Sequence, residues 1–371
     1  LLADMPNPST RNLLTAFLPL LGVYLLCILP FASAPCERDE CDYIESSVQL
    51  AAGGAYTAGS SGVLWRGPGY PLVLVPFAWL HLPWAAAKLL NAAFVFAGVL
   101  YLYRALRLYV PHRPALLASY AFGLYPPNFR QLPFLLTESL AVFLVCGIIY
   151  HFCSFSRNPG RRRHYFVASL FLAYLALTKI FFGYVLLVAL LLSLFALCFR
   201  AGAARVSATI CLLALLMCSP YLVLTYSMTG RPFYWGSSGG LSLYWMSTPY
   251  AGEYGSWHSI RAAQTNPELA RHRVFFQGLE GLDEFTRDDV LRARAMENIR
   301  THPFKYVENV FANMGRLLFS YPFSYTPQKL STYFYLLPNM FLVVLLVLGI
   351  VPAVQRRQAV PREIIALMAF C

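Results

Sequence analysis

LLTAFLPLLGVYLLCILPFAS, residues 13–33, is an apolar run without a charged residue. It is about as long as an α-helix that crosses the hydrocarbon core of a bilayer. Small residues follow at 32–34, as they do at the cleavage site of a signal peptide. However, the run exceeds the roughly 7–15 residues of a signal-peptide core, and Pro35 follows directly. We therefore expect a retained membrane helix.

The composition extends this interpretation to the whole chain of 371 residues. It is 58% hydrophobic and 12% charged, whereas a soluble domain carries about 25% charged residues. These values exclude a soluble enzyme, a disordered chain and a collagen-like repeat, and they predict an all-α polytopic membrane protein. The predicted further spans are 84–106, 114–128, 132–156, 164–178, 180–199, 206–228 and 333–354.

The net charge of +12 is largely a topology signal and does not indicate a nucleic-acid partner. Clusters of basic residues should be cytoplasmic, with two crossings between neighbouring clusters. Segment 70–82 is short and holds two prolines, so we expect an interfacial or re-entrant piece; if it crosses, the first span reverses. The four clusters are Arg104/Arg107/Arg113, Arg157 with Arg161–Arg163, Arg200/Arg205 and Arg356/Arg357/Arg362.

This scheme divides the chain into three parts. Residues 1–228 form a transmembrane module with a first outer loop at 35–83. Residues 229–331 form an extracytoplasmic segment, in which acids from Asp283 onward precede a helix expected over 288–300. Residues 332–371 hold C-terminal spans, and the chain stops inside an apolar run, so we expect the natural protein to continue.

The few acids gather at the predicted outer face, where the first outer loop carries Glu37, Asp39, Glu40, Asp42 and Glu45. This cluster could be a solvated helix entry, supply a general base or hold a divalent cation.

Glu138 is the one acid within a predicted span, and Lys88 and Lys179 fall near the same face. Ionisable residues in membrane spans are functional candidates, although snorkelling to the interface is the alternative and the one we favour for Lys88.

Cys36 and Cys41 bracket the acids of the loop. They predict a disulfide if the outer compartment is oxidising, and two free thiols otherwise. The sequence shows no metal-ligand spacing, so no metal site is assigned. It shows no Walker or dinucleotide glycine motif either, so we do not expect bound ATP as the energy source.

A series of short motifs resembles the polyprenyl-phosphate-sugar-dependent glycosyltransferases of the GT-C class. This group contains protein O-mannosyltransferases and the aminoarabinose transferase of lipid A. The likeness runs from the first span to about Tyr321, but Tyr221 replaces a usual Trp and Thr225-Tyr226 a common Arg-Asn, leaving subfamily and acceptor open. In order, the motifs are Asp39-Glu40-Cys41-Asp42-Tyr43, Leu50 to Tyr56, Arg66-Gly67-Pro68-Gly69-Tyr70-Pro71, Lys88-Leu89-Leu90-Asn91, Leu136 to Leu140, Leu177-Thr178-Lys179, Ser219-Pro220-Tyr221, Gly230-Arg231 and Gly239 to Leu243.

The resemblance implies transfer of a sugar from a polyprenyl phosphate to a hydroxyl or amine, with inversion. It implies a site on the extracytoplasmic face, with residues 229–331 reading a glycan, lipid or protein acceptor. The short loops and the lack of obvious eukaryotic sorting signals favour a bacterial inner membrane. Other membrane proteins could be partners. The implied catalytic residues are Asp39 as base, Glu40 as its substitute and Glu138; the phosphate-binding residues are Lys179, Arg66 and Lys88; the substrate-binding residues are Tyr43, Tyr56, Tyr70 and Arg231.

Two rival functions remain at this point. One is a non-catalytic membrane subunit or lipid-binding scaffold with the same fold, and activity of the isolated chain on a lipid-linked sugar would discriminate. The other is a transporter, which the absence of paired broken helices and mid-membrane charge pairs in the sequence disfavours. The tyrosines also have a simpler interpretation as interfacial anchors.

Overall fold

The computed structural model describes residues 10–37, 39–54, 64–158, 160–199, 202–319, 336–344 and 348. Within these ranges all regular elements are helices. Four helical segments there are long and apolar enough to cross a membrane, namely Leu13–Phe31, Trp84–Leu106, Thr137–Arg157 and Ala204–Thr229. The predicted all-α membrane class is therefore confirmed at this coarse level. The chain divides into two compact units, Leu1–Trp235 with Ala359–Cys371, and Gly236–Gln358.

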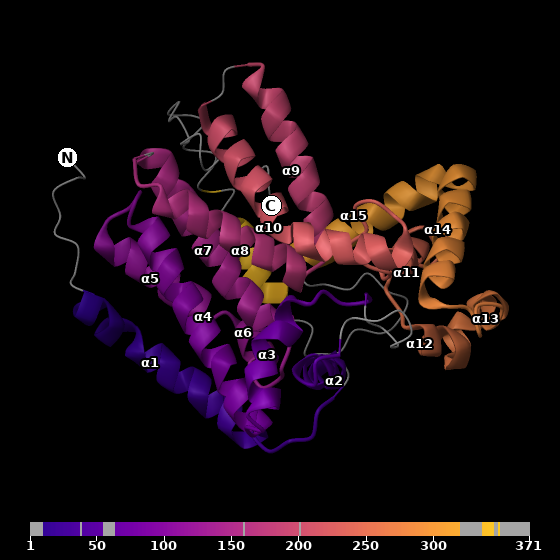
Figure 1. Ribbon diagram of the computed structural model, residues 1–371, viewed down its shortest axis with the longest axis horizontal. Coiled ribbons are helices and arrows are strands. Elements are labelled where there is room, and N and C mark those ends of the chain that lie inside the picture. The colour runs from indigo at the N-terminus through magenta and orange to yellow at the C-terminus, as the bar shows by residue number, and fades with distance from the viewer. Residues whose placement is uncertain are drawn as a thin grey trace. The chain divides into compact units, whose positions relative to one another are not determined.

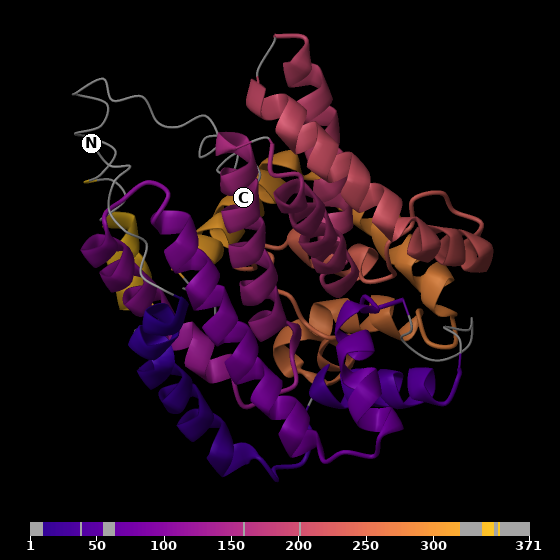
Figure 2. The same cartoon turned by 60° about the vertical axis from the view of Figure 1, so that its left-hand side comes forward.

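The first unit is built around α4 (Trp84–Leu106), whose bounds match the predicted span. It packs against α1 (Thr10–Ile28) on one side and α7 (Thr137–Arg157) on another (Figures 1 and 2). Phe17 and Tyr24 of α1 are fully buried in this core. The remaining long helices of the unit are α8 (Arg163–Thr178), α9 (Phe181–Leu197) and α10 (Gly202–Thr229), which pack on one another.

The predicted span 114–128 is not one helix. It is α5 (His112–Gly123) followed by α6 (Pro126–Gln131). The break falls before Pro126-Pro127, because a residue that precedes proline is pushed out of the helical region, and Tyr125 is extended. Side chains satisfy the released carbonyls: Tyr24 donates to the Gly123 oxygen at 2.8 Å and Asn128 to the Phe122 oxygen at 3.0 Å.

Two further helices lie in the predicted first outer loop. They are α2 (Asp39–Ala51) and α3 (Gly69–Trp79), which pack against each other. An eleven-residue helix is only about 16 Å long, too short to cross a bilayer by itself. The short segment predicted at 70–82 therefore folds as a non-spanning helix, and its side chain Tyr70 is buried.

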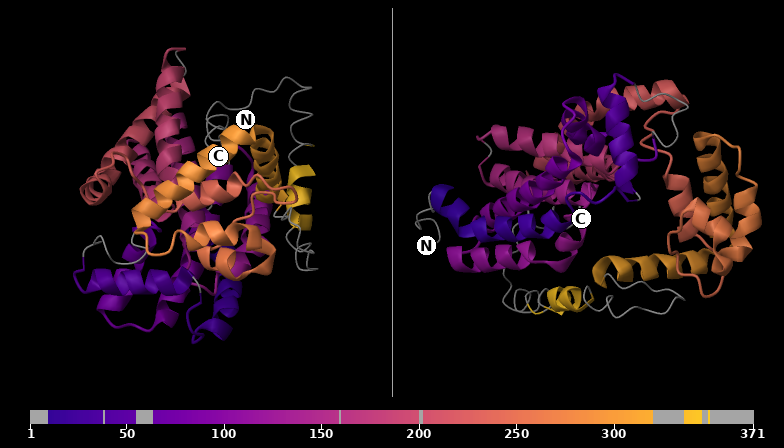
Figure 3. Two further views of the ribbon diagram at one scale, coloured as in Figure 1. Left: turned by 90° about the vertical axis from the view of Figure 1, so that its right-hand side faces the viewer. Right: turned by 90° about the horizontal axis from the view of Figure 1, so that it is seen from below.

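The second unit begins with α11 (Gly239–Met246), α12 (Ile260–Thr265) and a short 3-10 turn (Pro267–Leu269). Then come α13 (Ala270–Gln277), α14 (Glu284–Thr301) and α15 (Pro303–Phe319), and the chain turns sharply between the last two (Figure 3). The predicted helix with acids near its start is present, but it begins at Glu284, four residues before the predicted 288–300. Asp283 caps α14 by accepting the amides of Phe285 and Thr286 at 3.0 Å.

Gly240 explains how α11 and α14 pack so closely. A Cβ on Gly240 would lie 2.3 Å from the Asp288 carbonyl oxygen, so any side chain would separate the helices. Its amide donates to the buried Asp288 carboxylate at 2.5 Å. Burial raises the pKa of Asp288, against the effect of this amide and of Arg292. Gly240 of the motif at 239–240 thus has a structural role.

Several predictions concern residues outside the described ranges. Residue 56, the basic residues at 356–362 and most of the predicted span 333–354 lie there. Within 332–371 the structure describes a helix over 336–344 and the helical residue 348.

Candidate functional site

A tight loop brings two predicted phosphate-binding residues to one place. Residues 66–69 lie against the C-terminal end of α8, where a Cβ on Gly67 would be 2.0 Å from the Leu177 oxygen. A Cβ on Gly69 would be 2.4 Å from the Thr178 hydroxyl oxygen, and Tyr174 donates to the Gly69 oxygen at 2.7 Å. Only glycines permit this approach. It places Arg66 beside the turn that carries Lys179.

Arg66 is held by two carboxylates of α2. One guanidinium nitrogen lies 2.7 Å from Asp39 Oδ1 and the other 2.6 Å from Asp42 Oδ2. Asp39 and Asp42 are three residues apart, and this spacing puts both on one face of the helix. The Asp39 side chain remains 60% exposed. The Asp39 carboxylate is therefore held in place by an ion pair and is still accessible to solvent.

A second ion pair joins α7 to the end of α8. Lys179 Nζ lies 2.9 Å from Glu138 Oε1, and both side chains are partly exposed. Glu138 lies within the candidate membrane span Thr137–Arg157, but at its very start, whereas the sequence analysis began that span at residue 132. The helix begins at Thr137, so Glu138 stands in its first turn, where the helix dipole favours an acid. Residues 132–136 precede the helix as a turn and an extended stretch.

Tyr43 packs against Arg66 of the first ion pair and interacts electrostatically with Glu138 of the second. The Arg66 guanidinium stacks over its ring at 5.5 Å, and Tyr70 meets the ring edge-on at 5.2 Å. Burial raises the pKa of Tyr43 to about 12; Arg66 works against this, while Glu138 and Asp39 add to it. Tyr43 therefore keeps its proton at neutral pH and can donate a hydrogen bond. We call Asp39, Asp42, Tyr43, Arg66, Glu138 and Lys179 the charged cluster.

Glu40, the next residue of α2, is 1% exposed, in contrast to Asp39. Its carboxylate lies 3.5 Å from Lys88 Nζ and accepts the Leu135 amide at 3.0 Å. The prediction that Lys88 snorkels to an interface is wrong, since its side chain is 3% exposed. The Lys88 ammonium also donates to the carbonyl oxygens of Phe31 at 3.1 Å and Ala34 at 3.4 Å. A structural role accounts for this geometry, whereas phosphate binding would require these contacts to break.

The predicted disulfide is present: Cys36 and Cys41 are bonded across the start of α2. It links the loop before the helix to the first helical turn, in which Asp39 and Glu40 stand. The disulfide thus limits the positions of both carboxylates.

The remaining predicted substrate residues differ in setting. Tyr70 is buried, and its hydroxyl donates to Asn91 at 3.4 Å, so it packs in the core under Tyr43. Arg231 follows α10, and its guanidinium stacks over Tyr234 at 5.5 Å. Tyr56 lies outside the described residues.

The sequence analysis missed two residues of this site. Asp42 was counted as one acid of the loop but not assigned to Arg66, although its spacing from Asp39 could have indicated it. Asn91 was quoted within a motif without a role. Its amide donates to the carbonyl oxygens of Leu132 at 3.0 Å and Phe134 at 2.6 Å, which ties α4 to the segment before α7.

Metal binding is not indicated by the described part of the chain. There, no group of three or more His, Cys, Asp or Glu side chains is placed to hold a metal ion. Asp39 and Asp42, two acids of the loop in which a divalent cation was considered, both contact Arg66.

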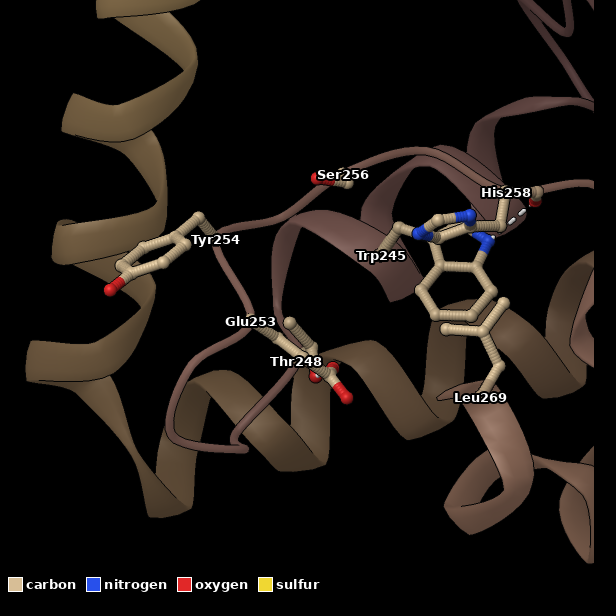
Figure 4. A pocket seen from close by; sticks show the side chains of 7 residues that line it. All are labelled: Trp245, Thr248, Glu253, Tyr254, Ser256, His258 and Leu269. Carbon is tan, nitrogen blue, oxygen red and sulfur yellow. Dashed lines mark hydrogen bonds between the residues drawn. The ribbon is translucent and has the colours of Figure 1, made fainter. Parts of the chain in front are cut away.

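A separate polar network lies in the second unit, beside a small pocket (Figure 4). Buried His272 contacts the Tyr244 hydroxyl at 2.7 Å and the Glu253 carboxylate at 3.1 Å. Burial works to raise the pKa of Glu253, but hydrogen bonds from His272 and Thr248 outweigh it, and the pKa falls below its ordinary value. The cavity, about 10 Å³, has room for about one water molecule. This network fits a structural core better than a ligand site.

Comparison with known proteins places no further constraint on the site. No family model matches the chain, and no curated protein matches it.

Proposed function

We propose that this chain is a membrane glycosyltransferase that moves a sugar from a polyprenyl phosphate to an acceptor hydroxyl or amine. The observation that carries the proposal is the charged cluster itself. Two cations, Arg66 and Lys179, are each paired with carboxylates that remain partly exposed. The motif resemblance supplies the substrate class, and the four helical segments long and apolar enough to cross a membrane support a lipid-linked donor of this kind.

The cations suit the donor phosphate. Arg66 offers a planar fork and Lys179 a point charge, and both can bind phosphate oxygens. Exposed ion pairs contribute only about 0–1 kcal/mol, so a phosphate can replace Asp39 at Arg66 and Glu138 at Lys179 at low cost. Donor binding would then free the Asp39 carboxylate as it fixes the leaving group.

The freed carboxylate suits the acceptor. Asp39 would take the proton of the acceptor hydroxyl as its oxygen attacks the anomeric carbon. The bond between that carbon and the phosphate oxygen breaks, and the polyprenyl phosphate leaves with the electron pair. Arg66 and Lys179 stabilise the charge that develops on it. One displacement of this kind inverts the anomeric configuration.

Asp42 and Tyr43 complete the proposed arrangement. Asp42 keeps Arg66 in position after Asp39 has turned to the acceptor. Tyr43, protonated at neutral pH, can donate a hydrogen bond to the sugar or to a phosphate oxygen. The site would face the extracytoplasmic side of a bacterial inner membrane.

The proposal is tested with the purified chain in lipid nanodiscs, supplied with sugars carried on polyprenyl phosphate and with candidate acceptors. Product formation by this chain alone supports it. Absence of turnover, together with a stable partner in native membranes, would favour the non-catalytic scaffold instead.

Lys179→Met separates donor binding from the acceptor. Loss of a charge-assisted hydrogen bond of about 1.5–3 kcal/mol should raise the donor KM about 10- to 100-fold and leave the acceptor KM nearly unchanged. Arg261→Ala, which removes an exposed cation of the second unit, is the matched control and should change neither. An unchanged donor KM in Lys179→Met would remove this residue from the phosphate site.

A further inference from the structure

Helix α15 buries its polar face. Asn309, its fully buried residue, donates to the carbonyl oxygens of Met246 at 3.1 Å and Thr248 at 3.0 Å. Arg316 donates to the Tyr254 oxygen at 2.9 Å, and Lys305 to the Glu253 oxygen at 2.6 Å. These polar side chains attach the helix to the loop that carries the Glu253 network.

The opposite face of α15 is apolar and open. Phe304 is 90% exposed and Phe311 66% exposed. These two residues belong to a row of exposed apolar side chains along α15. At about 100° per residue, the row is centred about 180° around the helix from Asn309. The spacing of three and four residues is that of a single helix face. The members of the row are Phe304, Val307, Phe311, Met314 and Leu318, and we call it the apolar stripe.

This arrangement is the reverse of a helix in a soluble domain, which buries its apolar side. An exposed apolar patch of this kind marks an interaction surface. The chain itself indicates what covers it. The second unit begins at Gly236, shortly after α10 ends at Thr229, and α10 contains a segment apolar enough to span a membrane.

The chain that follows α15 is also apolar. Beyond it the chain continues to the apolar helix at 336–344, where Leu337 and Phe341 are exposed. Along the chain, apolar helices thus occur both before α15, in α10, and after it, at 336–344 within the second unit. Because α10 contains a candidate membrane span, the apolar phase nearest along the chain to the second unit is a lipid bilayer.

We propose that α15 lies along the membrane surface, with the apolar stripe in the lipid and the polar face towards the second unit. Amphipathic helices bind in this way at the boundary between headgroups and acyl chains. A segment that appeared from its hydrophilicity to leave the membrane would then rest on it. Because Lys305 and Asn309 bind the 246–254 loop, the position of α15 would also set the distance of the Glu253 network from the lipid.

The test uses the full chain in nanodiscs, with a benzophenone amino acid replacing Phe304 or Phe311 one at a time. Both positions are exposed and aromatic, so the replacement leaves the polar contacts of α15 in place. Glu297 on α14, whose side chain is 61% exposed, is the matched control position. After illumination, mass spectrometry identifies what each probe has captured.

We expect at least ten-fold more lipid adduct at positions 304 and 311 than at 297. Capture of residues 1–235 would show that the stripe packs on the first unit, and capture of a second copy would show a dimer surface. Either result, or the absence of any adduct at 304 and 311, would overturn the proposal.

Discussion

Asp39 and Glu40 are neighbours in the sequence, yet they lie in opposite environments. Asp39 is 60% exposed and holds Arg66 together with Asp42. Glu40 is 1% exposed, pairs with Lys88 and accepts two backbone amides. In the Asp39-Glu40 pair, the first carboxylate is therefore exposed to solvent and the second is buried in the protein interior.

The difference separates two uses of charge. An exposed pair is worth about 0–1 kcal/mol, so a substrate can replace one partner. A buried pair contributes little net stability, but removing one partner leaves a charge uncompensated in the interior. The ion pair of Glu40 with Lys88 thus fixes the N-terminal turn of α2. The ion pairs of Asp39 with Arg66 and of Glu138 with Lys179 can instead be replaced by contacts with a substrate.

The largest effect is expected from Glu40→Gln. Loss of this charge leaves the Lys88 ammonium buried without its counter-ion, and the free energy of unfolding should fall by about 3–5 kcal/mol. Thermal unfolding of the detergent-solubilised chain measures it. The double variant Glu40→Leu/Lys88→Met should recover much of the loss, since it removes both charges. Unaltered unfolding of Glu40→Gln would contradict the distinction between the buried and the exposed carboxylate.

A smaller effect is expected from opening the disulfide. The double variant Cys36→Ser/Cys41→Ser removes a short covalent loop. The unfolded chain gains conformational entropy, so the free energy of unfolding should fall by about 2 kcal/mol. A reducing agent should lower the unfolding temperature of the native chain and leave this variant unaffected. Cys198→Ser, at a free and exposed thiol, is the control. Equal sensitivity of both chains to reduction would show that the disulfide does not support α2.

The smallest effect is expected from Asp42→Asn. Arg66 keeps Asp39 as a partner, so the free energy of unfolding should change by no more than about 1 kcal/mol. Denaturant unfolding measures the change. A loss as large as that of Glu40→Gln would mean that the exposed carboxylates are structural as well.

Local patterns were enough to predict several elements. The apolar run at 84–106 matched the bounds of α4, and the acids from Asp283 onward indicated the helix α14, although its predicted start was four residues late. Hydrophobic periodicity and caps act within a few residues, so both are visible in the local sequence. The bracketing cysteines Cys36 and Cys41 indicated their disulfide for the same reason.

Contacts between distant residues limited the rest. The start of α7, and with it the position of Glu138, depends on the stretch before Thr137, where the Leu135 amide is bound by Glu40 from α2. The pairing of Glu40 with Lys88 likewise joins separate helices. No local pattern encodes such partners. In contrast, Pro126-Pro127 is a local signal for the break between α5 and α6. The sequence analysis overlooked this signal because it followed the continuous apolar run at 114–128.

The central claim is that Asp39 is the exchangeable base of a sugar transfer. Its most direct test is the rate of transfer from a polyprenyl-phosphate sugar by purified Asp39→Asn in nanodiscs, measured beside its unfolding. The account predicts a rate at least about 100-fold below that of the native chain, with unfolding changed as little as in Asp42→Asn. A rate close to that of the native chain would contradict it.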